Sequence, residues 1–193
     1  TSQDEYTAFC RENPREVDVL FKDLLISVPR FFRDPEEFEA LRKALKVKLD
    51  PESSKPLRVW VAGCATGEEA YSVGMILADA LGGPMALRKE KLQIFATDID
   101  SAALTLARKG QYGTAILDQV PEQFANQYLV SSGDGLRVSD ALRTAVLFSE
   151  HNVCQDPPFL GMELSCCRNL LIYFGASLQR KVLARLHYAL RPD

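Results

Sequence analysis

The stretch 58–77 constrains the fold of this chain more than any other, because it reads as one buried strand, one tight loop and one helix. An apolar run of strand-forming residues at 59–62 comes first. Gly63 and Gly67 follow and bracket three residues over which the backbone must turn sharply. A buried strand that passes through a short glycine loop into a helix predicts a parallel α/β sheet.

A second unit of the same kind follows along the chain. Residues 92–97 read as a strand, Asp98 stands at its end, and Ser101 begins a helix. Further strands are predicted at 145–148 and 162–166, which gives a mostly parallel, doubly wound sheet with helices on both faces. An acidic residue at the end of the second strand of such a sheet is placed to bind the two hydroxyls of a ribose.

The glycine loop limits the kind of ligand. It is neither Gly-x-Gly-x-x-Gly nor a loop followed by Gly-Lys-Ser/Thr, so it does not predict a phosphate cradle. Glu68 and Glu69 in the first helical turn would repel phosphate and would suit an ammonium group. A nucleoside that carries an ammonium and no phosphate is S-adenosylmethionine (SAM). Taken alone, the loop is equally consistent with an ordinary strand-to-helix turn, and Asp98 favours the nucleoside.

The composition excludes several functional classes. A net charge of −3 gives no indication of a nucleic-acid or membrane partner, and no apolar run approaches the roughly 20 residues that span a bilayer. The five cysteines form no Cys-x-x-Cys pair, and two histidines are too few for a zinc site, so we expect no metal. Reduced thiols in a cytoplasmic protein are the expectation. The start at Thr1 suggests a trimmed chain with no signal peptide.

Several motifs together resemble the CheR family of chemotaxis-type protein-glutamate O-methyltransferases, which depend on SAM. These motif sequences are most similar to those of CheR modules that larger hybrid proteins carry together with CheB and sensor domains. The resemblance covers nearly the whole chain and rests on Arg30–Pro35, Cys64–Ser72, Ala96–Asp100 and Cys167–Phe174, with support from His151-Asn152 and Asp156–Phe159.

The resemblance implies a domain plan. Residues 1–50 would be the remnant of an N-terminal helical domain plus a linker helix, and 57–193 would be a Rossmann-like SAM-binding methyltransferase domain. A β-hairpin insertion is expected at 127–138, and the closing C-terminal strands of the family are missing, as in a truncated or a degenerate copy. The partner would be a chemoreceptor or similar signalling protein, and the chain a monomer.

The resemblance also implies site residues. Glu69 would bind the methionine ammonium and Asp98 the ribose, while 152–153 would flank the adenine and 169–170 would line the methionine side. The implied cofactor-binding positions are Ser27, Pro29, Arg33, Gly63, Glu68, Glu69, Asp98, Asn152, Val153, Asn169 and Leu170.

Arg33 and Tyr173 are the catalytic positions that the resemblance implies, facing the incoming glutamate. Methyl transfer to a carboxylate needs no general base, because a glutamate with a pKa of about 4.3 is already ionised. Simpler roles stay open: Asn152 and Asn169 as caps of their loops, Tyr173 as a core residue, and Arg33 as the partner of a surface acid such as Glu36 or Glu37.

Departures from the family pattern keep a second function open, and besides the missing terminal segments they are Pro29, Ser27, and Glu163 and Ser165, where the family usually has an aspartate and an apolar residue. Family members usually carry threonine where Pro29 stands, and often asparagine where Ser27 stands. Proline offers neither an N–H nor a hydroxyl, so one hydrogen bond to cofactor or substrate is lost. The alternative function is therefore a weakened CheR-like module that binds SAM, its product or a signalling partner without turnover. The family motifs disfavour a small-molecule methyltransferase.

Overall fold

The computed structural model describes residues 3–13, 16, 29–48, 55–88 and 90–192. Ser27 lies outside these ranges, as does most of the segment 14–26, where Pro14 and the apolar spacing of Val17, Leu20, Phe21, Leu24 and Leu25 predict a helix. Within them no helix is long and apolar enough to cross a membrane.

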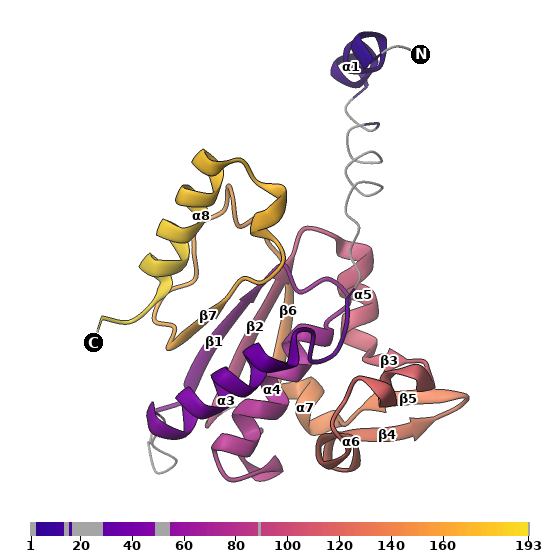
Figure 1. Ribbon diagram of the computed structural model, residues 1–193, viewed down its shortest axis with the longest axis vertical. Coiled ribbons are helices and arrows are strands. Elements are labelled where there is room, and N and C mark those ends of the chain that lie inside the picture. The colour runs from indigo at the N-terminus through magenta and orange to yellow at the C-terminus, as the bar shows by residue number, and fades with distance from the viewer. Residues whose placement is uncertain (1–2, 14–15, 17–28, 49–54, 89, 193) are drawn as a thin grey trace.

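The centre of the molecule is a parallel four-stranded sheet (Figure 1). Its strands are β1 (Leu57–Ala62), β2 (Leu92–Asp98), β6 (Val146–Glu150) and β7 (Leu164–Cys166), in the order β6-β2-β1-β7. In β1 and β2 buried residues fall on neighbouring positions, as expected for a parallel sheet that is covered on both faces. All four predicted strands are confirmed, with ends that shift by one or two residues.

The two faces of the sheet belong to two separate apolar cores. Because successive side chains of a strand point to opposite faces, Val59 and Val61 enter one core while Trp60 and Ala62 enter the other. The first core lies under α4 (Glu68–Ala80), α5 (Ser101–Lys109) and α7 (Asp140–Ala145), and α8 (Ala176–Ala189) covers the second. Helices on both faces are therefore confirmed.

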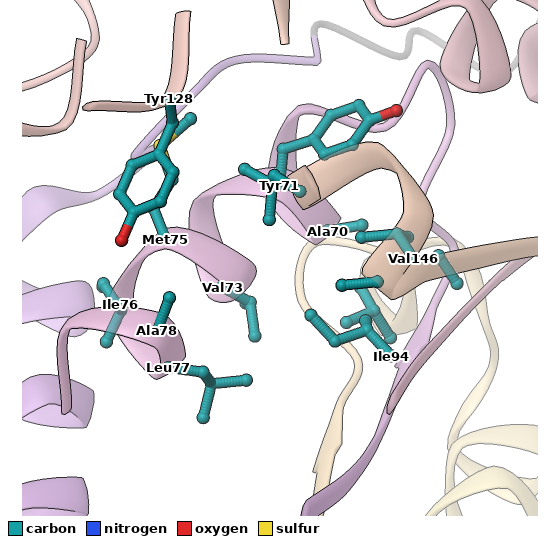
Figure 2. Close-up of a cluster of buried hydrophobic side chains, with 14 of the residues drawn as sticks. Ala70, Tyr71, Val73, Met75, Ile76, Leu77, Ala78, Ile94, Tyr128 and Val146 are labelled. Carbon is teal, nitrogen blue, oxygen red and sulfur yellow. The ribbon is translucent and has the colours of Figure 1, made fainter. Parts of the chain in front are cut away.

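Helix α4 is the most deeply buried helix of the first core. Its side chains from Ala70 to Ala78 are all buried, and they pack with Ile94, Tyr128 and Val146 (Figure 2). Burial on every side is typical of a helix enclosed by its neighbours. Because α4 is held in this way, the loop that precedes it is fixed at the end that joins the helix.

The remaining helices are short or lie at the margins. Helix α1 covers Gln3–Glu12, and α3 covers Pro35–Lys48 and packs on α4 through buried Phe38 and Leu45. The 3-10 turns are η1 (Pro84–Ala86), η2 (Thr114–Asp118) and η3 (Leu171–Tyr173).

A small antiparallel sheet lies beyond α7, at the opposite end of the molecule from α8 (Figure 1). Its order is β3-β5-β4, from β3 (Gln111–Tyr112), β4 (Leu129–Ser132) and β5 (Gly135–Val138), with α6 (Glu122–Tyr128) before β4. Strands β4 and β5 form a hairpin within the range 127–138. Tyr128, expected in the hairpin, instead ends α6. Strand β3 lies between Gly110 and Gly113, two glycines that in the sequence predict only a turn. A strand of two residues is too short to show an alternating pattern.

Candidate functional site

A pocket of about 560 Å³ opens where β1, β2, β6 and β7 reach their carboxyl ends. This is the edge at which an open parallel sheet binds its ligand. Of the predicted site positions that the structure describes, all but Glu68 line the pocket: Pro29, Arg33, Gly63, Glu69, Asp98, Asn152, Val153, Asn169, Leu170 and Tyr173.

The floor of the pocket is the glycine loop, and Asp98 holds it from below. The backbone N–H groups of Gly63 and Cys64 donate to the carbonyl of Thr97 at 2.7 and 3.0 Å. The Asp98 carboxylate accepts a hydrogen bond from the Ala65 N–H at 2.8 Å. Gly63 has φ of +77°, which glycine adopts without a steric cost. Asp98 therefore lies at the predicted strand end and is tied to the loop that lines the pocket.

The other half of the loop is held by Glu68 and by Tyr112 of β3. Gly67 has φ of +97°, and a Cβ there would lie 3.0 Å from the Ala107 Cβ. The Thr66 hydroxyl donates to the Glu68 carboxylate at 2.7 Å, and the Tyr112 hydroxyl donates to the Thr66 carbonyl at the same distance. Burial raises the pKa of Glu68, against the lowering effect of the Thr66 hydroxyl. Glu68 thus supports the loop and does not reach the pocket.

Glu69 is the carboxylate that does face the pocket. Burial raises its pKa from 4.5 to about 7, although the cations of Arg168 and Arg33 act to lower it and Asp34 acts to raise it again. Its Oε2 lies 4.0 Å from the Arg168 Nη1, and its Oε1 is buried without a hydrogen-bond partner among the described residues. A buried carboxylate short of partners suits a cationic ligand group.

Arg168 is a pocket residue to which the sequence analysis gave no role. Its Nη2 donates to the backbone carbonyl of Arg33 at 2.7 Å and lies 3.1 Å from the Asp34 carboxylate. Its guanidinium also lies over the Phe38 ring, 4.7 Å from the centroid. The available sequence signal was its place directly before Asn169, at the end of a strand that delivers site residues.

The segment before α3 brings Arg33 to the pocket. The N–H of Phe31 donates to the Gln119 side chain and that of Phe32 to the Ser72 hydroxyl, both at 3.0 Å. Both phenylalanine side chains are buried, so the segment is fixed on either side. The Arg33 side chain remains 41% exposed and available to a ligand.

The simpler role left open for Arg33, an ion pair with a surface acid, is met by Asp34. Its Nε lies 4.0 Å from the carboxylate of Asp34, its neighbour in sequence, and not beside Glu36 or Glu37. An exposed pair at this distance contributes about 0–1 kcal/mol. The pairing therefore places little constraint on what else Arg33 binds.

The loop after β6 forms another wall of the pocket. The Asn152 Oδ1 accepts from the Cys154 N–H at 2.9 Å, and the Asn152 N–H donates to the Asp156 carboxylate at 2.7 Å. Asn152 therefore caps its loop and lines the pocket at once. Val153 beside it is buried and apolar, as the flank of a flat aromatic ligand needs to be.

The fourth side of the pocket comes from the stretch after β7. Asn169 has φ of +55°, a left-handed conformation that asparagine tolerates better than most residues. A Cβ on Gly63 would lie 3.0 Å from the Leu170 Cδ2, so the glycine is what lets this stretch approach the loop. Tyr173 is 47% exposed at the pocket, which rules out the core role left open for it.

No group of three or more His, Cys, Asp or Glu side chains within the described residues is arranged to hold a metal. All five cysteines carry free thiols. Burial raises the pKa of Cys166 and of Cys167 to about 12, so these two thiols stay protonated at neutral pH.

Comparison with known proteins finds a family model that matches most of this chain. The model of the family described as "CheR methyltransferase, SAM binding domain" matches residues 27–193. The chain is 37% identical over 188 residues to an uncharacterized 104.1 kDa protein of Rhodobacter capsulatus, covering 96% of this chain and 20% of that protein. It is 32% identical to chemotaxis protein methyltransferase 2 of Pseudomonas aeruginosa, covering 98% of this chain and 68% of that protein.

Among solved structures, magnesium protoporphyrin IX methyltransferase of Synechocystis PCC 6803 with bound SAH has a TM-score of 0.44 at 14% identity, over 80% of this chain and 51% of that chain. The chain thus spans a fifth of the Rhodobacter protein and about two-thirds of the Pseudomonas one.

Proposed function

The chain belongs to the CheR methyltransferase family, and from that premise we propose that it transfers a methyl group from SAM to a glutamate carboxylate of a chemoreceptor or a related signalling protein. It would act in the cytoplasm, as a monomeric protein-glutamate O-methyltransferase module of a longer protein. The observation that carries the proposal is Glu69, whose carboxylate has one buried oxygen without a partner among the described residues and lines the pocket together with Asp98.

The residues present fit SAM. Glu69 would hold the ammonium, and Asp98, which keeps lone pairs beyond the two backbone bonds it accepts, would hold the ribose hydroxyls. Buried Val153 and the amide of Asn152 would take the adenine. When bound, SAM supplies an electrophilic methyl group on a sulfonium. Asn169 and Leu170, on the fourth side of the same pocket, would line the methionine side.

The task of the protein is then to orient the carboxylate and to exclude water from it. A guanidinium grips a carboxylate in a fixed plane, so Arg33 is suited to hold the incoming glutamate. Correct orientation alone lowers a barrier by roughly 7–11 kcal/mol. Tyr173, exposed at the pocket, would complete the substrate side. A base is not required, because the glutamate arrives ionised at neutral pH.

Pro29 favours a second candidate function, a module that binds SAM or its product without turnover. Pro29 lines the pocket at the position where the family resemblance implies a threonine hydroxyl. One missing hydrogen bond corresponds to about 0.5–1.5 kcal/mol, which weakens a site more readily than it abolishes one. We therefore rank this candidate second.

Two measurements on the same preparation separate the candidates. Calorimetric titration with S-adenosylhomocysteine (SAH) tests the cofactor site, and transfer of a labelled methyl group from SAM to the cytoplasmic fragment of a chemoreceptor tests the reaction. Binding with base-labile label on glutamate supports the enzyme, and binding without label supports the second candidate. A chain that does not bind SAH contradicts both.

A further inference from the structure

Arg168 joins two parts of the pocket that lie far apart in sequence. Its Nη2 donates to the backbone carbonyl of Arg33, which is 135 positions earlier in the chain. Its Nη1 lies 4.0 Å from the Glu69 carboxylate and is buried without a hydrogen-bond partner among the described residues. The Phe38 ring lies against the guanidinium, with its centroid 4.7 Å from the Arg168 Cζ. One rigid group therefore touches both the segment that carries Arg33 and the acid that faces the pocket.

The surroundings of Glu69 make Arg168 its main cationic partner. The titratable groups that interact with Glu69 are Arg168, Arg33, Asp34, Cys64, Cys166 and Cys167. Burial raises the pKa of all three thiols, so they are neutral near pH 7. Arg168 is the one cation in the described part of the chain at ion-pair distance from Glu69.

We propose that Arg168 is a positioning residue that couples Glu69, at the cofactor end of the pocket, to the backbone of Arg33, at the substrate end. The proposal rests on the proposed function, which assigns Glu69 to the cofactor and Arg33 to the glutamate. The two arms of the guanidinium have different tasks. The Nη1 arm places a positive charge beside Glu69 that lowers its pKa against the effect of burial, and the Nη2 arm holds the carbonyl of Arg33 and the carboxylate of Asp34.

Two substitutions divide these tasks. Arg168→Lys keeps the positive charge but replaces a planar fork with a single ammonium, which cannot serve both ends at once. Arg168→Met removes the charge and the fork but still covers the Phe38 ring. Arg42→Met is the matched control, because Arg42 also joins α3 to α4, at 3.5 Å from Asp79, and does not line the pocket.

The readouts are SAH affinity by calorimetry between pH 6 and 8, and hydrogen exchange of the amides at 31–37 with and without SAH. In the wild type we expect SAH to slow this exchange. Arg168→Met should move the pH midpoint of SAH binding up by about one unit, as the loss of a cation beside a carboxylate does. Arg168→Lys should leave the midpoint in place, quicken exchange at 31–37 about tenfold, and abolish its response to SAH. Arg42→Met should change neither.

The outcomes distinguish this inference from the function on which it rests. A wild-type chain that does not bind SAH refutes the proposed function, and the coupling with it. If the wild type binds SAH, the coupling is overturned when Arg168→Lys exchanges and responds to SAH as the wild type does. It is equally overturned when Arg168→Met loses affinity by the same factor at every pH, which is the result of a merely structural role. Should Arg168→Met fail to fold, the exchange of Arg168→Lys decides.

Discussion

Lowering the pH from 8 to 6 should weaken SAH binding about tenfold, because Glu69 must be ionised to hold an ammonium group. Burial raises its pKa to about 7, so roughly nine-tenths of the chains carry the charge at pH 8 and about one-tenth at pH 6. A tenfold change in that fraction corresponds to about 1.4 kcal/mol of binding free energy. Above pH 8 the affinity should level off.

The stability of the ligand-free chain should change in the opposite direction. A carboxyl whose folded-state pKa is raised favours the folded state at low pH, and that contribution is lost as the pH rises through the folded-state value. For Glu69 the window runs from 4.5 to about 7, and its full extent is about 3 kcal/mol. Unfolding by urea, followed at pH 5 and pH 8, measures this term. The same acidification thus stabilises the empty fold while it weakens the binding of SAH.

Glu69→Gln and Glu68→Gln form the matched pair for this experiment. Glutamine at position 69 removes the charge, so SAH should bind weakly and with no slope between pH 6 and 8. Glutamine at position 68 still accepts the Thr66 hydroxyl bond and should keep the slope of the wild type. Calorimetry across the pH range would refute the reasoning if the wild type showed a flat profile, or if Glu69→Gln retained the slope.

Three further substitutions test the site and its loop. Asp98→Ala should weaken SAH binding by about 1.5–3 kcal/mol in calorimetry, since a charged acceptor is lost, and an unchanged dissociation constant would remove Asp98 from the site. Arg33→Lys should lower methyl transfer roughly 100-fold while SAH binds within a few-fold, because a displacement of about 1 Å at the reacting centre has that cost; normal turnover would contradict the role of Arg33. Gly67→Ala should lower the melting temperature, because φ is +97° and the new Cβ would meet Ala107 at 3.0 Å, and a melting temperature equal to that of the wild type would contradict this packing.

The sheet and the location of the pocket were predictable from the sequence because local patterns determine both. Apolar runs at 59–62 and 92–97 indicate buried strands, and the carboxyl ends of parallel strands meet at one edge. Asp98 could be placed there from its position alone. The structure brings it to that edge and adds the bond to Ala65 that no pattern indicates.

What the sequence left undetermined depends on contacts between distant segments. Glu68 and Glu69 look equivalent in sequence, and only the phase of α4, set by the conformation of the loop before it, turns one to Thr66 and the other to the pocket. Arg168 gained its role from a carbonyl 135 positions away. Contacts of this kind have no local signature, because they follow from how complete elements pack.

The backbone around the pocket contains strained conformations that lower the free energy of unfolding. Among the described residues, four non-glycine positions have a left-handed φ, and all lie in the pocket wall or in the segment beside it: Phe32, Asp34, Ala65 and Asn169. Aspartate and asparagine tolerate this conformation, whereas each of the other two side chains costs about 1–2 kcal/mol. Laboratory evolution for heat resistance alone should therefore accumulate glycine at position 65, and selection for turnover should restore the alanine. Position 32 should stay phenylalanine, because its buried ring packs on Phe38 and Phe124 and losing it would cost about 3–5 kcal/mol. In this fold, relieving backbone strain to raise thermal stability therefore changes residues of the pocket itself.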